Sequence, residues 1–133
     1  MKFLNCQSSI GGLYYNVYSD TQGGTGHFEK EDTLLDPLNN KYLYSNQCKE
    51  DTIGDKSKHV LLTKEYGISK VDVSCNTTLT IGQISFGYDG KIYSQLGKNI
   101  KEITTPCEIK LFNEKDKFTT IMVEPKTGYI HKI

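Results

Sequence analysis

Short runs of apolar and β-branched residues alternate with clusters of turn residues from position 59 to the C-terminus, which limits the fold to one built from short strands. Of the 30 Val, Ile and Thr residues in the chain, 23 lie in residues 56–133, and the chain contains no alanine. β-Branched side chains favour pleated sheets, whereas alanine is the strongest helix former. We therefore predict a mainly β fold, an antiparallel sheet or a β-sandwich built from short hairpins, which becomes α+β only if an N-terminal helix remnant is present.

Seven strands are predicted in this half of the chain. Cys107, Ile109 and Leu111 share one parity, which is the period-2 pattern of a half-buried strand. The parity of the apolar residues switches around Gly82, so we predict a bulge or a bend there. The predicted strands span residues 59–64, 68–74, 79–86, 91–96, 106–112, 118–124 and 128–133.

Short turns connect these strands and predict antiparallel neighbours. Tyr88-Asp89-Gly90 offers an Asp side chain that can hydrogen-bond the backbone ahead of it, followed by a glycine that accepts a positive φ. A polar loop at residues 113–117 forms the next hairpin, and a turn between Pro125 and Gly128 forms the last.

The length predicts one domain, residues 1–133, with an irregular, loop-rich part at 1–58 and an antiparallel β part at 59–133. In the first part, "GGLYYNVYSD" fits either a strand or the end of a helix, and a weak strand is expected at residues 41–44. We predict that the remainder is a long loop tied down by Cys48.

The four cysteines predict two disulfides and an oxidising compartment, because they are well separated and show neither C-x-x-C nor zinc-ligand spacing. Three connectivities are possible. We favour Cys75–Cys107, since each adjoins a predicted strand of the same half, which leaves Cys6–Cys48. Four reduced, buried thiols in a cytosolic protein are the alternative.

All 16 cationic side chains are lysines, balanced by 16 acids, so sequence-specific nucleic-acid recognition is not expected without the bidentate fork of arginine. Residues 56–133 carry 12 of the lysines and eight acids. Weak, non-specific contact with DNA through Lys98 and Lys101 is one expectation. A solvated lysine-rich surface is the other.

No catalytic or cofactor motif stands out. His27, His59 and His131 share no metal-binding spacing, and we interpret each as an exposed or hydrogen-bonded structural histidine. Five acids between Asp20 and Asp36 could hold calcium on a loop, although their spacing matches no EF-hand and a solvated acidic loop is the alternative. We predict a protein that is not an enzyme and carries no cofactor.

Tyrosine is abundant, with nine residues in the chain. Tyr88 and Tyr93 flank the central turn, and with Lys98 and Lys101 they form a possible contact surface, because a tyrosine ring buries area while its hydroxyl stays wet. Packing in the core or at its rim is the alternative for most of the nine.

Three features of residues 59–133 together suggest a family. They are an I-x-F strand at 84–86 followed by the turn glycine Gly90, the sequence T-P-C at 105–107, and a closing hairpin with P-x-T-G-Y-I at 125–130. In these features the chain resembles the C-terminal part of minor pseudopilins of the FimT/GspH class, which are type IV pilin-like proteins.

The resemblance implies a mostly β, pilin-like head domain that in full-length members follows a prepilin cleavage site and an apolar helix anchored in the inner membrane. It implies a periplasmic location, no enzymatic activity, and assembly with other pseudopilins or pilus subunits in type II secretion, type IV pili or DNA uptake (competence). This chain has neither the cleavage motif, nor a signal peptide, nor the run of roughly 20 apolar residues that a membrane helix needs. It would therefore correspond to the soluble head alone.

Two other function classes stay open. A secreted carbohydrate-binding β-sandwich would stack exposed tyrosines on sugar rings. A small secreted hydrolase would need two carboxylates brought together by folding in a concave pocket.

Overall fold

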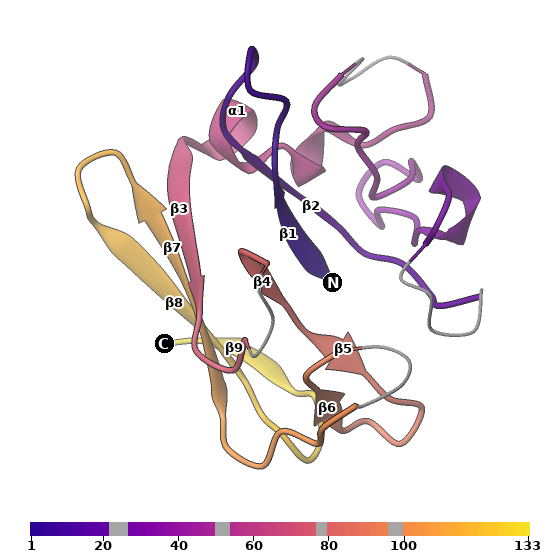
Figure 1. Ribbon diagram of the computed structural model, residues 1–133, viewed down its shortest axis with the longest axis vertical. Coiled ribbons are helices and arrows are strands. Elements are labelled where there is room, and N and C mark those ends of the chain that lie inside the picture. Colours follow the sequence, from indigo (N-terminus) through magenta and orange to yellow (C-terminus); the bar gives the residue numbers. More distant parts are fainter. Residues whose placement is uncertain (22–26, 50–53, 77–79, 96–99) are drawn as a thin grey trace.

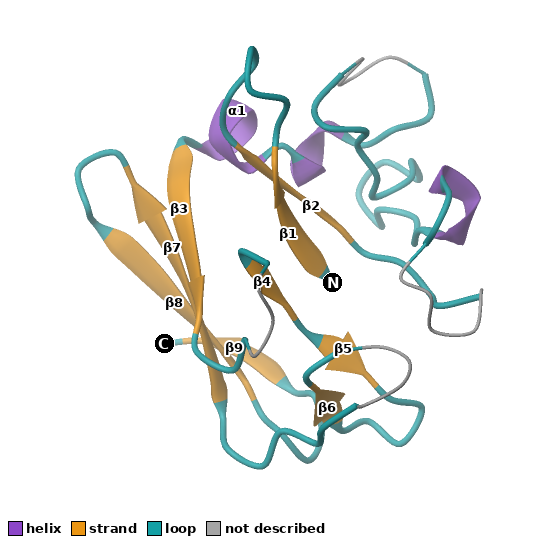
Figure 2. Cartoon of the chain, in the orientation of Figure 1, coloured by secondary structure: helices purple, strands orange, loops and turns teal. Residues whose placement is uncertain are grey.

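The computed structural model describes residues 1–21, 27–49, 54–76, 80–95 and 100–133. The protein is mainly β, and every pairing between its strands is antiparallel, which confirms the predicted fold class (Figure 2). In order, the elements are β1 (Lys2–Asn5), β2 (Leu13–Asn16), the 3-10 helices η1 (Lys30–Asp32) and η2 (Lys58–Val60), α1 (Leu62–Tyr66), β3 (Ile68–Val73), β4 (Gly82–Gln83), β5 (Ser85–Phe86), β6 (Ile92–Tyr93), β7 (Cys107–Asn113), β8 (Phe118–Val123) and β9 (Ile130–Lys132).

The largest sheet has the strand order β3-β7-β8-β9 and confirms four of the predicted strands. Its inner face carries Val71, Ile109 and Val123, which are buried in the main core, while Lys70 and Asp72 point to the exposed side. The alternation read from the sequence is therefore the alternation of the sheet. The polar loop between β7 and β8 turns where predicted, with Asn113 N donating to Lys117 O at 2.9 Å.

The second sheet, β2-β1-β4, brings two strands into the part of the chain predicted to be loop-rich. β2 is the strand that the sequence left open against a helix end at residues 11–20, whereas β1 was not predicted. Phe3 of β1 and Leu13 of β2 face the main core, whereas Tyr14 packs in a second core cluster with Cys48 and residues near η2. This β1–β2 hairpin is buried on both faces, so its strands lack the polar-apolar alternation that marks a half-exposed strand. Figure 1 shows the arrangement: β3, β7 and β8 lie on one side, the hairpin lies beside them, and the segments of residues 27–49 and 54–61 lie beyond it.

The predicted strand at residues 59–64 is wrong, because this segment forms η2 and α1. Val60, Leu61 and Leu62 are consecutive and all buried, which a strand with only one buried face would not allow. Ser57 caps η2 by accepting a hydrogen bond from His59 N, and Gly67 ends α1 with a φ of 65°. The weak strand expected at residues 41–44 is reduced to isolated bridges at Tyr42.

The predicted strand at 79–86 is divided into β4 and β5, which belong to different sheets. The chain therefore bends close to Gly82, as predicted. Gly82 itself is required by close packing, since a Cβ there would lie 2.5 Å from Val73 Cγ2. The predicted strand at 91–96 is confirmed only as β6, and residues 79 and 96 lie outside the described residues.

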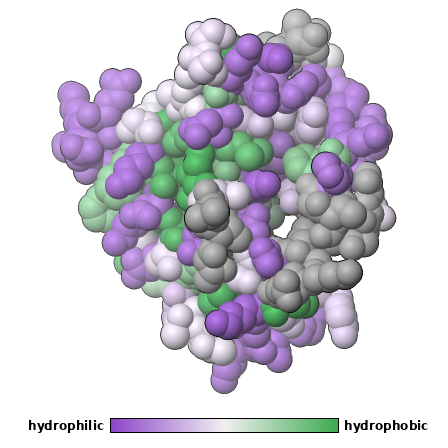
Figure 3. Space-filling model, viewed as in Figure 1, coloured by the Kyte–Doolittle hydropathy of each residue, from purple (hydrophilic) through white to green (hydrophobic). Residues whose placement is uncertain are grey.

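Part of the molecular surface between the two larger sheets is apolar. Figure 3 shows hydrophobic side chains gathered between β1 and β3, with hydrophilic side chains over most of the rest of this face.

The amino group of Met1 lies inside this framework and donates a hydrogen bond to Ile84 O at 2.9 Å. Desolvation by burial lowers the pKa of this amino group to about 6, from 8.0. The folded chain therefore binds fewer protons than the unfolded chain between these two values. We expect the free energy of unfolding of the 133-residue chain to rise by about 2–3 kcal/mol across that pH interval.

Urea unfolding between pH 5.5 and 8.5 measures this slope. Acetylation of Met1 removes the titrating amine, so the acetylated chain is expected to show a smaller pH dependence than the unmodified one. Equal slopes for the two chains would contradict the assignment.

Candidate functional site: a surface formed by two turns

Two turns that are far apart in the sequence, residues 87–90 and 125–128, lie against each other. A Cβ on Gly128 would lie 2.9 Å from Gly90 O and 3.3 Å from Phe86 Cδ1, so the backbones approach more closely than a side chain would permit. Ile92 N also donates to Pro125 O at 3.1 Å, which ties β6 to the second turn. Both glycines have positive φ, 79° at Gly90 and 65° at Gly128, where other residues are strained.

Asp89 fixes the geometry of the first turn. Its carboxylate accepts hydrogen bonds from Lys91 N at 3.1 Å and from the Tyr93 hydroxyl at 2.8 Å. The bond from Tyr93 lowers the pKa of Asp89 and raises the pKa of Tyr93 to about 12. The tyrosine hydroxyl therefore supports the turn.

Four large side chains on or next to these turns are exposed, and we call them the turn-pair surface: Phe86, Tyr88, Tyr129 and Ile130. Tyr88 is fully exposed, and Tyr129 is 64% exposed. Tyr129 stacks on His131 with ring centroids 5.4 Å apart, so its ring is held in place although it faces solvent. Rigid, exposed aromatic rings bind partners at a low cost in conformational entropy.

The four residues proposed from the sequence as a contact surface do not all lie on the turn-pair surface. Tyr88 is on the turn-pair surface. Tyr93 is half-buried with its hydroxyl bonded to Asp89, and Lys101 is exposed on the segment paired with Ser94, whose N donates to Lys101 O at 2.9 Å. Lys98 lies outside the described residues. Sequence reasoning missed Phe86, Tyr129 and Ile130, because nothing local indicates that the two turns meet.

The structure contains both favoured disulfides, Cys75–Cys107 and Cys6–Cys48. Cys75 follows β3 opposite Cys107 of β7, where Ser74 N donates to Glu108 O and Glu108 N donates back to Ser74 Oγ, both at 2.9 Å. This disulfide therefore continues the β3–β7 ladder. Two disulfides are consistent with an oxidising, extracytoplasmic compartment.

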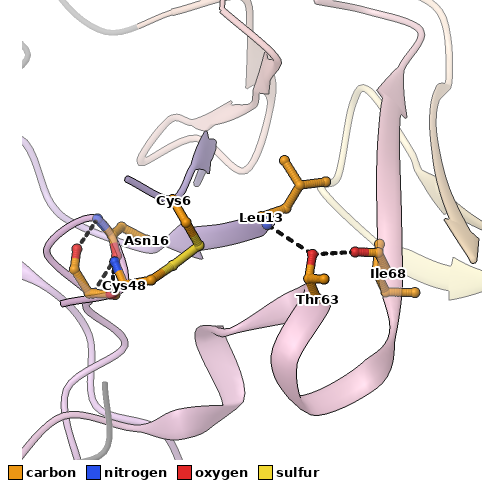
Figure 4. Close-up of a disulfide and its surroundings, with 7 residues drawn as sticks. Cys6, Leu13, Asn16, Cys48, Thr63 and Ile68 are labelled. Carbon is orange, nitrogen blue, oxygen red and sulfur yellow. Dashed lines mark hydrogen bonds between the residues drawn. A yellow bond between two sulfur atoms is a disulfide. The ribbon is translucent and has the colours of Figure 1, made fainter. Parts of the chain in front are cut away.

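The second disulfide holds the non-strand segment of residues 45–48 to the β1–β2 hairpin (Figure 4). Asn16 of β2 accepts from Ser45 N at 2.9 Å, and Ser45 Oγ accepts from Cys48 N at 3.0 Å. On the other side of the hairpin, Thr63 Oγ1 accepts from Leu13 N at 2.9 Å and donates to Ile68 O, joining α1 to β2 and β3.

A buried carboxylate, Asp36, organises a cluster of polar side chains that the sequence did not reveal. It is 3% exposed and accepts hydrogen bonds from Ser57 Oγ and His59 Nδ1, both at 2.6 Å, and from Leu38 N at 2.9 Å. Burial alone would raise the pKa of Asp36, but the accepted hydrogen bonds and the nearby imidazole outweigh it and lower the pKa. His59 is thus a hydrogen-bonded structural histidine, as interpreted from the sequence.

Asp36, Ser57 and His59 do not form the arrangement of a serine hydrolase. A nucleophilic serine must donate to the imidazole, which is then oriented by the acid on its far side. Here Ser57 Oγ donates to Asp36 directly, and Asn39 Nδ2 donates to Ser57 Oγ at 3.1 Å. The cluster connects residues 36–39 with residues 57–59 and does not activate the serine.

The acids proposed as calcium ligands are not brought together. Asp32 accepts from Thr21 Oγ1 and Glu29 N, both at 2.8 Å, whereas Asp36 faces His59. Among the described residues, no group of three or more His, Cys, Asp or Glu side chains is placed to hold a metal ion.

Tyrosines in the first half of the chain pack against other side chains. Tyr14 is buried, and the ring of Tyr18 stacks on the ring of Phe28 with centroids 3.8 Å apart.

Comparison of the chain with protein-family models, with curated proteins and with solved structures gives no significant match. In the described parts of the chain, no helix has both the length and the apolar character needed to cross a membrane.

Proposed function

We propose that this chain is a non-enzymatic assembly domain that works outside the cytoplasm, and that it is the head of a minor pseudopilin, as its resemblance to that class implies. The turn-pair surface is the face that docks onto neighbouring pilin-like subunits in the periplasm. The full-length protein is then anchored in the inner membrane and serves type II secretion, a type IV pilus or DNA uptake.

One observation carries this proposal: residues 86–88 and 129–130 expose large apolar and aromatic side chains on two turns that are locked together. Exposed residues of this kind, gathered on neighbouring turns, are typical of recognition surfaces. The same two turns carry part of the sequence on which the pseudopilin resemblance rests, namely Gly90 and the segment from Pro125 to Ile130.

The encoding gene tests the family part of the proposal. Codons upstream of residue 1 are expected to specify a short basic leader, a prepilin cleavage motif and an apolar helix of about 20 residues. A different reading frame or a stop codon there would contradict it.

Substitution of the exposed tyrosines Tyr88 and Tyr129 tests whether the turn-pair surface is the docking face. Tyr88→Ser with Tyr129→Ser is expected to weaken binding to the heads of pilin-like proteins encoded beside this gene by at least tenfold, since buried aromatic anchors contribute about 2 kcal/mol or more. Both rings are exposed in the free domain, so the free energy of unfolding should change by less than about 0.5 kcal/mol. Biolayer interferometry and urea unfolding measure the two quantities.

Tyr66→Ser is the matched control, because Tyr66 is 55% exposed on α1 and outside the turn-pair surface. Equal loss of binding in the control and the double variant would refute the assignment of the surface.

Weak DNA contact through Lys98 and Lys101 remains a separate prediction, which titration with duplex DNA at low and moderate salt would test.

A carbohydrate-binding module is the second candidate, favoured by the full exposure of Tyr88. On a glycan array, the pseudopilin proposal expects no specific binding. Binding that disappears in the Tyr88→Ser variant would favour the carbohydrate module instead.

A further inference from the structure

The strand β9 forms one edge of the four-stranded sheet, because the order β3-β7-β8-β9 gives it only β8 as a neighbour among the described strands (Figure 1). Two hydrogen bonds fix which of its backbone groups face inward. Tyr129 O accepts from Glu124 N at 2.9 Å, and Ile133 N donates to β8 at 3.1 Å. Backbone groups of successive residues point to opposite sides of an antiparallel strand, so the N–H and C=O groups of Ile130 and Lys132 point away from β8.

Large side chains are exposed on both faces of this edge. Tyr129 and Ile133 lie on one face, where Ile133 is 68% exposed, and Ile130 lies on the other, where it is 55% exposed. The stacking of Tyr129 on His131 agrees with this alternation. Proline and bulges, which commonly protect edge strands, are both missing from residues 130–132. The edge is therefore open to pairing with another strand.

We propose that β9 pairs with β9 of a second copy of this chain, in an antiparallel arrangement centred on His131. The outward-facing residues then oppose each other, with Ile130 against Lys132 of the second copy. Each copy donates two backbone hydrogen bonds, from Ile130 N and Lys132 N, and accepts two. The two four-stranded sheets become one continuous sheet, which is the usual result of strand addition at an exposed edge.

The side chains favour a second copy as the occupant of this edge. In the proposed register, Tyr129 lies opposite Ile133 of the second copy, and the same pair forms again on the other side of the two-fold axis. Pairs of an aromatic and a β-branched side chain stabilise neighbouring strands. Lys132 lies opposite Ile130, so no two lysines face each other directly and the lysine stem packs on an apolar side chain. The edge is thus complementary to itself.

Sedimentation equilibrium of the 133-residue protein, at concentrations up to about 1 mM, tests the pairing. The interface is small, so we expect a weak monomer–dimer equilibrium. Lys132→Pro is expected to weaken the dimer about tenfold or more, because proline removes an N–H that pairs only with the second copy. That N–H does not bond to β8, so the fold of the monomer should survive, which urea unfolding checks.

Lys132→Thr is the matched control for the proline variant. It loses the same charge but keeps the backbone N–H and supplies a β-branched side chain, so the dimer should weaken less than about threefold. Equal losses in the two variants would assign the association to the ammonium group and overturn the strand pairing. A dimer that persists in the proline variant, or a monomer over the whole concentration range, would also overturn it.

The His131→Cys variant tests the register and does not rely on the folding of the proline variant. In the proposed pairing, the two residues at position 131 face each other outside the hydrogen-bonded pairs, where Cα atoms lie about 4.5 Å apart and a disulfide can form. All native cysteines are already paired. We therefore expect a disulfide-linked dimer with oxidised glutathione as the oxidant. Lys115→Cys, on the exposed loop between β7 and β8, should stay monomeric, and equal crosslinking from both positions or none from position 131 would contradict the register.

The pairing rests on the assembly function proposed above, for which it names a second copy as one neighbour, but the two proposals fail separately. A protein that stays monomeric and still binds the heads of pilin-like proteins overturns the β9 pairing alone. A dimer that is sensitive to Lys132→Pro and binds none of those heads contradicts the pseudopilin proposal and supports the pairing.

Discussion

Replacement of Cys75 and Cys107 together by serine is expected to lower the free energy of unfolding by about 3–4 kcal/mol. The disulfide spans 32 positions and restricts the unfolded chain, which is the main source of this effect in the chain-entropy account. Cys107 is also completely buried in the main core, where a serine hydroxyl would lack the packing of sulfur. Urea unfolding of the oxidised wild type and of the double variant measures the difference.

Reductant supplies the control for this prediction. Dithiothreitol should destabilise the wild type beyond the loss caused by the Cys75/Cys107 substitution, because it also opens Cys6–Cys48. In the double variant, the remaining sensitivity to reductant should come from Cys6–Cys48 alone. A loss below about 1 kcal/mol in the double variant would mean that the β3–β7 ladder does not depend on its disulfide.

Substitution of Asp36 by asparagine is expected to lower the free energy of unfolding by about 2–4 kcal/mol. The carboxylate accepts from Ser57, His59 and the backbone at once. An amide can accept with only one end and would place its own donor against a donor of the cluster. Asp72→Asn is the matched control, because Asp72 lies exposed on β3 and should change stability by less than about 0.5 kcal/mol.

The effect of Asp36 depends on pH in a defined direction. Its pKa is lowered in the folded state, so its stabilisation is fully present above the unfolded value near 4 and is lost as the pH falls through the folded value. The difference between wild type and Asp36→Asn should therefore be largest near neutrality and smaller near pH 3. A difference that grows on acidification would contradict the lowered pKa.

The sequence predicted those parts of the fold that depend on local patterns. Alternation marked β3 and β7, and the polar loop at residues 113–117 marked the hairpin that leads into β8. Asp89-Gly90 marked a turn whose side-chain and backbone geometry is local. β1 was not predicted, and β2 could not be told from a helix end, because their hairpin is buried on both faces and lacks alternation. The helices η2 and α1 were not predicted because Val60, Leu61 and Leu62 supply a run of apolar residues that fits either a strand or a helix.

The candidate site was only partly predictable for a related reason. Tyr88 was identified because it adjoins a recognisable turn, but the contact of Gly90 with Gly128 is a tertiary approach between residues 38 positions apart. The Asp36–His59 pair joins residues on either side of position 58, where the predicted boundary between the loop-rich part and the β part lies. Neither juxtaposition has a local signal.

Site-specific photocrosslinking in the native host tests the central claim, which is that this domain acts through the turn-pair surface. A photoreactive phenylalanine analogue at position 88 or 129 of the full-length protein is expected to crosslink to another pilin-like subunit. The same analogue at position 115, on the opposite β7–β8 hairpin, should not. Crosslinks from position 115 alone, or none from 88 and 129 in cells whose apparatus is assembled, would contradict the account.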